Sequence, residues 1–250
     1  MRLALIGYGK MGKILEALAA SRGHEIVAIV DPEVPGAGFR RLTAKAVEAA
    51  EVCLEFTGPH AAAGNLLRLC QLGKRVVVGT TGWYERLDEV AAVVAKRKAA
   101  VVYGANFSIG VNLFYRLVER AAELFGSLED RDLYVAETHH RAKADAPSGT
   151  AKKLAEIVLS KSRSKKRTVQ NLDDPIAADQ LQVVSTRAGW VTGIHRLGIE
   201  GPHDSIVLEH QARSREAFAD GALRAAEWLT TAAPGLYRFE DILDAMLARP

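Results

Sequence analysis

The sequence predicts an α/β protein in which a doubly wound parallel sheet is followed by a second domain of α+β type. Three observations support this class. Short apolar runs alternate with helical patterns up to residue 103, a glycine-rich turn follows the first run, and longer β-runs appear after Ser108. We therefore expect one domain over residues 1–108, joined by C-terminal helices within 216–250, and a second domain over residues 109–215.

Five short strands are expected in the first domain. They are the apolar runs at residues 2–6, 25–30, 52–56, 75–78 and 101–103, and such runs are typical of parallel strands buried on both faces. Apolar side chains at helical spacing predict helices over residues 10–21 and 60–72. Because strands and helices alternate along the chain, the strands are expected to form a parallel sheet.

The pattern changes in the second domain. Helices are expected over residues 109–124, with Ser108 as N-cap, and over residues 148–160, with a strand at 132–138 between them. The runs at residues 181–187, 191–200 and 205–211 predict an antiparallel or mixed sheet. Two last helices, at residues 215–229 and 239–247, are expected to fold back onto the first domain.

The composition is that of a soluble globular protein, with 250 residues, 48% of them hydrophobic and 25% charged. The net charge of +3 is too small to indicate nucleic acid or an anionic membrane as a partner. Five cations within residues 161–167 are interpreted as a solvated loop after a helix. Cys53 and Cys70 lie in apolar surroundings, which predicts buried free thiols. Neither a signal-peptide pattern nor a bilayer-spanning apolar run is found, so a cytoplasmic location is expected.

The turn Gly7-Tyr-Gly-Lys-Met-Gly12 has the G-x-G-x-x-G spacing of a Rossmann-type dinucleotide-binding loop. It follows one strand and opens a helix, and Asp31 ends the next strand, 19 residues after Gly12. A pyrophosphate is therefore expected at the helix N-terminus and the ribose hydroxyls at Asp31. Asp31 favours NADH, whereas Lys10 and Lys13 could offset the charge of a 2′-phosphate, so NADH and NADPH both remain open.

Two later loops also follow strands of the expected parallel sheet. They are GTTG at residues 79–82 and GANFS at residues 104–108. Open α/β sheets bind ligands at the carboxyl ends of their strands. The small residues and hydroxyls of these loops suit contact with nicotinamide and its ribose, although ordinary turn chemistry explains each loop equally well.

The segment ETHHRAKADAPSGTA at residues 137–151 concentrates cationic and titratable groups. His139 and His140 follow a strand and would point to opposite faces, and no cysteine or third histidine lies at ligand spacing. We therefore expect no metal. Two surface histidines without a task would be the ordinary interpretation, but Arg141 and Lys143 crowd the same segment. A lysine and a histidine near a nicotinamide would supply protons for a hydride transfer.

The end of the same segment predicts a capped helix start. Ser148 is placed to cap a helix whose first turn holds Gly149 and Thr150. Free backbone N–H groups and a threonine hydroxyl at such a start form an anion site. An ordinary capped helix is the alternative, but the cations just upstream favour a small molecule that carries carboxylates.

These motifs resemble the dihydrodipicolinate reductase family over almost the whole chain. The shared blocks are GYGKMG from Gly7, GTTG from Gly79, ANFSIGVN from Ala105, ETHHRAKADAPSGTA from Glu137, TRAGWVTGIH ending at His195 and HQARSREAFADGALRAAEWL from His210. The resemblance implies NADH- or NADPH-dependent reduction of 4-hydroxy-tetrahydrodipicolinate to tetrahydrodipicolinate, in the diaminopimelate route to lysine. It also implies a homotetramer assembled through the sheets of the second domain, which would then bind substrate while the first domain binds the dinucleotide.

Residue roles carried over from the family fall on matching positions of this chain. The resemblance implies that His139 and Lys143 are catalytic proton-transfer groups and that His140, Gly149 and Thr150 hold the dicarboxylate substrate. The implied cofactor contacts are Gly7, Tyr8, Gly9, Lys10, Met11, Gly12, Asp31, Gly79, Thr80, Thr81, Gly104, Ala105, Asn106 and Phe107. Pro32 stands directly after Asp31, where some members that accept both cofactors have a basic residue, which leaves the preference open.

Three other functions compete with this interpretation. An amino-acid or semialdehyde dehydrogenase would share the glycine loop, but it would not need the histidine–lysine segment with its capped SGT helix. A non-catalytic dinucleotide sensor would bind NADH without turnover. Nucleic-acid binding through residues 161–167 lacks an aromatic stacking platform nearby.

Overall fold

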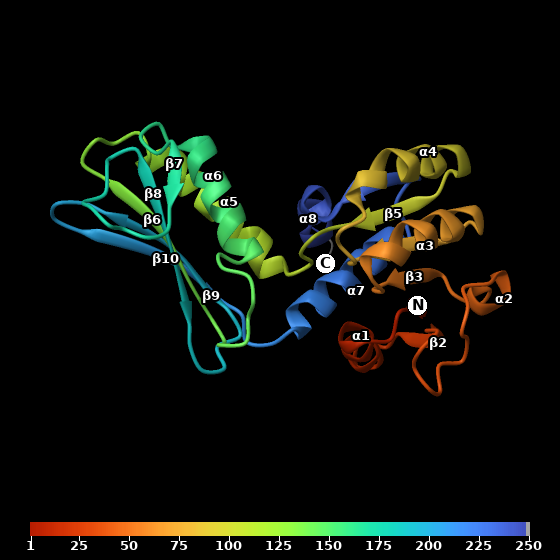
Figure 1. Ribbon diagram of the computed structural model, residues 1–250. Coiled ribbons are helices and arrows are strands. Elements are labelled where there is room, and N and C mark those ends of the chain that lie inside the picture. The colour runs from red at the N-terminus through yellow and green to blue at the C-terminus, as the bar shows by residue number, and fades with distance from the viewer. Residues whose placement is uncertain (249–250) are drawn as a thin grey trace. The chain divides into compact units, whose positions relative to one another are not determined.

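The computed structural model describes residues 1–248 and divides into two compact units (Figure 1). The first unit contains Met1–Ile109 and the C-terminal segment that starts at Arg215, and the second is Gly110–Ser214. Within the described residues, no helix is long and apolar enough to cross a membrane.

The first unit is built on a parallel sheet of order β11-β5-β4-β3-β1-β2. Its strands are β1 (Arg2–Ile6), β2 (Glu25–Val30), β3 (Val52–Glu55), β4 (Arg75–Val78), β5 (Ala100–Tyr103) and β11 (Gly235–Arg238). Its helices are α1 (Lys10–Ser21), α2 (Ala44–Val47), α3 (Pro59–Gln71), the 3₁₀ turn η1 (Tyr84–Arg86), α4 (Leu87–Arg97), α7 (Glu216–Leu229) and α8 (Phe239–Leu247). The predicted doubly wound sheet is confirmed.

Successive residues of each central strand enter two different cores, which explains the continuous apolar runs. Ala4 and Ile6 of β1 pack with residues of α2, α3 and α4, whereas Leu3 and Leu5 pack with residues of α1, α7 and α8. A strand buried on both faces needs an apolar side chain at every position. Cys53 and Cys70 are buried free thiols, as expected.

The strand β11 was not predicted. It pairs in parallel with β5 and so adds the C-terminal segment to the edge of the sheet. Its four residues follow Ala233-Pro234 and contain a glycine, so they lack the β-branched apolar run that identifies the other strands. Pairing with β5, and not local propensity, accounts for this strand.

The second unit has a mixed sheet of order β10-β9-β6-β8-β7, as predicted. Its strands are β6 (Asp132–His139), β7 (Arg167–Val169), β8 (Gln180–Arg187), β9 (Ile194–Glu200) and β10 (Ser205–Gln211). The helices α5 (Ile109–Phe125) and α6 (Gly149–Lys161) lie on one side of this sheet in Figure 1. A third core of residues from α5, α6, β6, β8 and β9 joins them. The strand expected from residue 191 begins only at Ile194.

The expectation of a solvated loop over residues 161–167 is wrong in one important respect. Lys165 is only 1% exposed, and its ammonium pairs with the carboxylate of Asp132. It also donates to the carbonyl oxygens of Ala178 and Gln180, at 3.0 and 2.8 Å. A run of cations in the sequence does not reveal which of them turns inward, because that depends on carbonyl groups supplied by a distant segment.

Candidate active site

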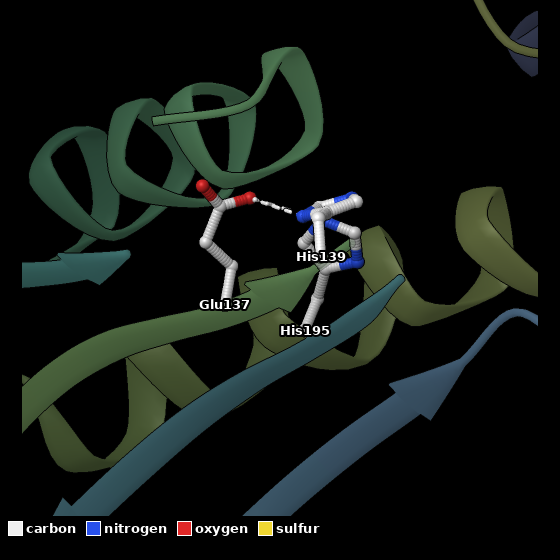
Figure 2. Close-up of side chains that lie close together, drawn as sticks. All are labelled: Glu137, His139 and His195. Atoms are coloured by element: carbon white, nitrogen blue, oxygen red, sulfur yellow. Dashed lines mark ion pairs between the residues drawn. The ribbon is translucent and has the colours of Figure 1, made fainter. Parts of the chain in front are cut away.

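The strand β6 changes character along its buried face. Leu133 and Val135 enter the core of the second unit, and the next two residues on that face are Glu137 and His139, both buried. Side chains two apart in a strand share a face, so the strand delivers a carboxylate and an imidazole where its apolar packing ends. Figure 2 shows these side chains together with His195 of β9.

The register of the neighbouring strands completes this cluster. In the antiparallel pair with β9, Glu137 lies opposite His195. In the parallel pair with β8, Ser185 lies opposite Glu137 and Arg187 lies opposite His139. β6 and the two strands that follow it much later in the sequence, β8 and β9, therefore direct polar groups to one place on the covered face of the sheet.

One carboxylate oxygen of Glu137 is fully occupied. Its Oε1 accepts hydrogen bonds from the backbone N–H of Ser148 at 2.9 Å, the hydroxyl of Ser185 at 2.9 Å and Arg187 Nη2 at 2.8 Å. Burial alone would raise the pKa of Glu137, but the hydrogen bonds from Ser148 and Arg187 outweigh it and lower the pKa to about 2. Glu137 is therefore a buried anion throughout the physiological pH range.

The other oxygen of Glu137 faces the two imidazoles. His139 Nδ1 lies 3.1 Å from Oε2, and His195 Nε2 lies 3.7 Å from it and 3.2 Å from the Ser148 hydroxyl. Burial lowers the pKa of His139, although the charge of Glu137 acts in the opposite direction. Burial and the neighbouring His139 lower the pKa of His195 to about 4. Both rings are therefore neutral near pH 7.

Lys143 lies in the loop that follows β6. Its ammonium is 2.7 Å from Asp145 Oδ1, and it is close enough to His139 for its charge to contribute to the lowered pKa of that ring. Arg187 Nη2 also donates to the carbonyl oxygen of Asp145 at 2.5 Å. Arg187 thus links the loop that carries Lys143 to the buried carboxylate of Glu137.

His140 and Arg141 occupy the start of this loop. The N–H of His140 donates to Val191 O at 2.7 Å, and the N–H of Arg141 donates to Gly189 O at 3.2 Å. The guanidinium of Arg141 lies over the ring of Trp190, 5.7 Å from its centroid, and Trp190 is 85% exposed. These contacts tie the loop after β6 to the segment between β8 and β9, which gives Arg141 a structural role.

The helix α6 begins as the sequence predicted. Ser148 is its N-cap, and the hydroxyl of Ser148 accepts from the N–H of Ala151 at 3.2 Å. Gly149 and Thr150 form the first turn. A methyl group on Gly149 would meet no atom within 4 Å, so its backbone is open to a ligand. Since Ser148 also donates to Glu137, the carboxylate holds this helix start beside the histidines.

Glu137, His139 and His195 could also approach a single cation, because one potential ligand atom from each lies within 4.8 Å of the others. This group was not predicted from the sequence. However, Arg187 already pairs with Glu137, and a guanidinium at that carboxylate opposes a second positive charge. That the chain uses no metal stays a prediction.

The glycine loop of the first unit has the geometry of an anion cradle. Gly7 has a φ of +94°, and methyl groups at Gly7 and Gly12 would lie 2.4 Å from Phe56 O and 2.5 Å from Gly7 O. A methyl group at Gly9 would meet nothing within 4 Å. Gly9 also starts α1 without a side-chain cap, which leaves N–H groups for a phosphate. Gly7 and Gly12 are therefore required for close packing of the loop, and Gly9 leaves open space for a ligand.

Asp31 lies at the end of β2, beside this loop. Its carboxylate accepts from the N–H groups of Tyr8, Glu33 and Val34 at 2.7, 2.9 and 3.0 Å. Burial would raise the pKa of Asp31, but these backbone hydrogen bonds lower it overall. Of the other predicted contacts, Lys10 is exposed and Met11 is half-buried.

The two later loops differ in how much they expose. Thr81 and Ala105 are exposed, Gly79 is half-buried, and Thr80 and Gly104 are buried. Asn106 turns its side-chain oxygen to the N–H of Ser108 at 2.9 Å. Phe107 is a core residue, with its ring centroid 4.6 Å from that of Phe239. A role for Phe107 at the cofactor is a prediction that its burial does not favour.

Sequence reasoning overlooked Glu137, Arg187 and His195 as site residues. Glu137 stands two positions before His139, so strand alternation could have placed both on one face. His195 closes the TRAGWVTGIH block, but its partner on β6 depends on strand register. Arg187 carried no local signal, because its role depends on pairing between β6 and β8.

Comparisons with known proteins agree with this architecture. The family model described as dihydrodipicolinate reductase, N-terminus, matches residues 1–107, and the model described as dihydrodipicolinate reductase, C-terminus, matches residues 110–243. The chain is 33% identical to 4-hydroxy-tetrahydrodipicolinate reductase of Christiangramia forsetii, covering 97% of this chain and 98% of the relative. It is 34% identical to the protein of the same name from Methanoregula boonei, covering 94% of each.

A solved structure supports the same relationship. Dipicolinate-bound dihydrodipicolinate reductase from Paenisporosarcina sp. TG-14 is similar with a TM-score of 0.79 and 25% identity, over 97% of this chain and 99% of that one. DAP dehydrogenase of C. glutamicum, with a TM-score of 0.57 and 12% identity over 100% of this chain and 96% of that one, shares the fold alone. Since both family models together match most of the sequence, the chain belongs to the dihydrodipicolinate reductase family.

Proposed function

We propose that this protein reduces 4-hydroxy-tetrahydrodipicolinate to tetrahydrodipicolinate with NADH or NADPH, in the diaminopimelate route to lysine. The observation that carries the proposal is the folding of ETHHRAKADAPSGTA into one site, in a chain matched by both family models. The reaction consumes one hydride and one proton, and the 4-hydroxyl group leaves as one molecule of water. When bound, the dinucleotide supplies the hydride, and side chains of the protein manage the protons.

His139 and Lys143 are the proposed proton-transfer groups. His139 is neutral near pH 7 and lies at the end of the buried face of β6, so it can accept or return a proton. The ammonium of Lys143 is held by Asp145 and is partly exposed, which suits a proton donor. Both side chains belong to the same short segment, and the charge of Lys143 contributes to the lowered pKa of His139.

His140 and the first turn of α6 are the proposed substrate-binding groups. The open backbone of Gly149, the hydroxyl of Thr150 and the positive end of the helix dipole all favour a carboxylate. A dicarboxylate brings two negative charges, which accounts for the density of cationic residues in this segment. The dipicolinate named with the related structure from Paenisporosarcina is an aromatic dicarboxylate and suits the same groups.

The proposed dinucleotide site lies in the first unit, at the carboxyl ends of the parallel strands. The residues fit such a group, since the glycine loop leaves open space over the uncapped start of α1 and Asp31 stands at the end of β2. The proposed contacts are Gly7, Tyr8, Gly9, Lys10, Met11, Gly12, Asp31, Gly79, Thr80, Thr81, Gly104, Ala105, Asn106 and Phe107.

The choice between NADH and NADPH depends on the surroundings of Asp31. Phe39 pairs with Val30 beside β2, and the N–H of Asp31 donates to Phe39 O at 3.0 Å. Arg40 is thereby brought to the same edge, where its Nη1 donates to Pro32 O at 3.2 Å. A cation thus stands near Asp31 although no basic residue directly follows it in the sequence. We expect both cofactors to be used, and Arg40→Gln to raise the KM for NADPH severalfold while the KM for NADH stays within about twofold.

The assembly proposed from family resemblance is a homotetramer formed through the second unit. Helices α5 and α6 lie on one side of its sheet. Val184 and Val207 are 37% and 51% exposed, and apolar strand residues left exposed favour association between copies. Light scattering of the purified protein tests this, and a monomer at micromolar concentration would contradict it. Replacing Val207 with Lys should weaken a tetramer formed in this way.

The decisive experiment is a spectrophotometric assay of NADH and NADPH side by side. The purified protein should oxidise either cofactor only when the product of dihydrodipicolinate synthase is supplied. If neither NADH nor NADPH is oxidised at saturating concentration with that product present, the proposed function is refuted. Oxidation that needs no added product would also contradict it.

A further inference from the structure

We propose that Glu137 is a positioning residue that sets the tautomer of His139, with Nδ1–H facing Glu137 Oε2 and Nε2 left to exchange a proton with the substrate. The first part concerns the ring alone, and the second part rests on the proposed function. Neither the family comparisons nor the sequence assigns a task to this carboxylate.

The carboxylate of Glu137 has a fixed orientation. Three donors hold Oε1 within 2.9 Å, one at the start of α6 and two on β8, namely Ser148, Ser185 and Arg187. Because Oε1 is held by these donors, Oε2 is fixed on the side of the two imidazoles (Figure 2). The side chain of Glu137 is 0% exposed, so water does not compete for this oxygen. The carboxylate is therefore a preorganised acceptor.

The imidazole proton of His139 can be located from its surroundings. Glu137 Oε2 and His139 Nδ1 are both buried, and among the described residues neither makes a hydrogen bond. They lie 3.1 Å apart. An ionised carboxylate only accepts hydrogen bonds, so a proton on Nδ1 brings a donor next to a buried acceptor that lacks one, whereas a proton on Nε2 would set a lone pair against an anion. The neutral ring then carries its free lone pair on Nε2.

The space around His139 Nε2 also favours this tautomer. A methyl group at Gly193 would lie 3.0 Å from His139 Nε2, so only glycine leaves this side of the ring uncrowded. The competing ring, His195, has its Nε2 at the longer distance of 3.7 Å from Glu137 and beside the Ser148 hydroxyl. His139 is thus the imidazole that the carboxylate orients.

Arg187 connects Glu137 to the loop that carries Lys143. Its Nη2 donates both to Glu137 Oε1 and to the carbonyl oxygen of Asp145, and the side chain of Asp145 pairs with Lys143. One guanidinium therefore ties the carboxylate that orients His139 to the loop that holds Lys143. The relative placement of the two proton-transfer groups depends on this link.

Two other roles of Glu137 must be separated from positioning. The first is a purely structural anchor for the start of α6, through its bond from Ser148. The second is a metal ligand, together with His139 and His195. An anchor predicts no effect on the ring tautomer, and a ligand predicts that added Zn²⁺ shifts both histidine resonances at stoichiometric concentration.

Glu137→Gln separates these roles. The amide carbonyl can keep the three contacts of Oε1, while the amide NH2 then faces His139 Nδ1 and favours the tautomer with the proton on Nε2. Nitrogen-15 NMR of labelled histidine reports which ring nitrogen is protonated, and His139→Gln assigns the signal. Glu156→Gln is the matched control, since Glu156 lies on α6 with its side chain 69% exposed.

We expect wild type and Glu156→Gln to show Nδ1–H at His139 and Glu137→Gln to show Nε2–H. Turnover of Glu137→Gln should fall by about 100-fold, the lower range for loss of acid–base catalysis, with the KM for NADH within about twofold. A wild-type spectrum with Nε2–H overturns the proposal even if the variant does not fold. An unchanged tautomer or unchanged turnover in the folded variant also overturns it.

The tautomer readout keeps this proposal separate from the proposed function. A protein without reductase activity whose His139 still switches tautomer would retain the positioning role and lose the function. An active protein whose tautomer does not respond to Glu137→Gln would retain the function and lose the positioning role. A stoichiometric Zn²⁺ shift at both His139 and His195 would replace positioning with metal binding.

Discussion

The buried carboxylate of Glu137 should make the stability of Gly110–Ser214 depend on pH. Its pKa is lowered from 4.5 to about 2 in the folded protein. Because the folded value lies below the unfolded value, the ionised group stabilises the fold above pH 4.5, and this contribution is lost as the pH falls toward 2. At about 1.4 kcal/mol for each pKa unit, the full contribution is about 3 kcal/mol.

Glu137→Gln removes this titration while it preserves the size of the side chain. The difference in free energy of unfolding between wild type and variant should narrow by about 2 kcal/mol from pH 7 to pH 3, because about 60% of the contribution is lost over that range. Urea denaturation followed by circular dichroism measures the difference, and hydrogen exchange of the β6 amides assigns the transition to this unit.

The control is Glu156→Gln, which alters an exposed glutamate of α6. The free energy of unfolding of this variant should differ little from that of wild type, and by the same amount at both pH values, because an exposed ion pair contributes little. If the difference in free energy of unfolding between wild type and Glu137→Gln stays constant from pH 7 to pH 3, the pKa of Glu137 is not lowered in the folded protein and the prediction is refuted. That result would mean that the network around Oε1 does not favour the ionised carboxyl.

Three further predictions concern the proton donor, the glycine loop and the buried lysine. Lys143→Ala should lower kcat by about 100-fold or more and change the KM for NADH by less than about threefold; loss of NADH affinity in titrations would contradict its role. Gly12→Ala should weaken NADH binding by about tenfold or more in fluorescence titrations, since the new methyl group would lie 2.5 Å from Gly7 O. Equal NADH affinity in that variant would mean that the loop does not hold the cofactor. Lys165→Met should destabilise the second unit by about 2–4 kcal/mol in urea, because Asp132 and two carbonyl oxygens lose their buried partner. A variant as stable as wild type would show that these contacts contribute nothing net.

Much of the fold follows from local patterns. The apolar runs, the glycine turn after β1 and the Ser148 cap are each encoded within a few residues, because burial, backbone conformation and capping act over one strand or one helical turn. Features that depend on contacts between distant segments were not predicted, because local patterns do not encode them. The strand β11 forms only by pairing with β5, and Lys165 is buried only because Ala178 and Gln180 present their carbonyl groups to it.

The candidate site divides in the same way. His139, Lys143 and the helix start at Gly149 lie within one contiguous segment, so the sequence identifies them together. Arg187 and His195 join them only when β6 is known to pair with β8 and β9.

The amino-acid sequence alone is enough to determine the fold class, the family and the chemical groups that are available, because each depends on short motifs. The tertiary structure decides which of these groups meet. His195 and Arg187 reach Glu137 because strand register brings them to one face of the sheet, and a shift of one residue would turn them to the other. Register is set by the packing of the whole unit, and therefore no short segment of the sequence reveals it.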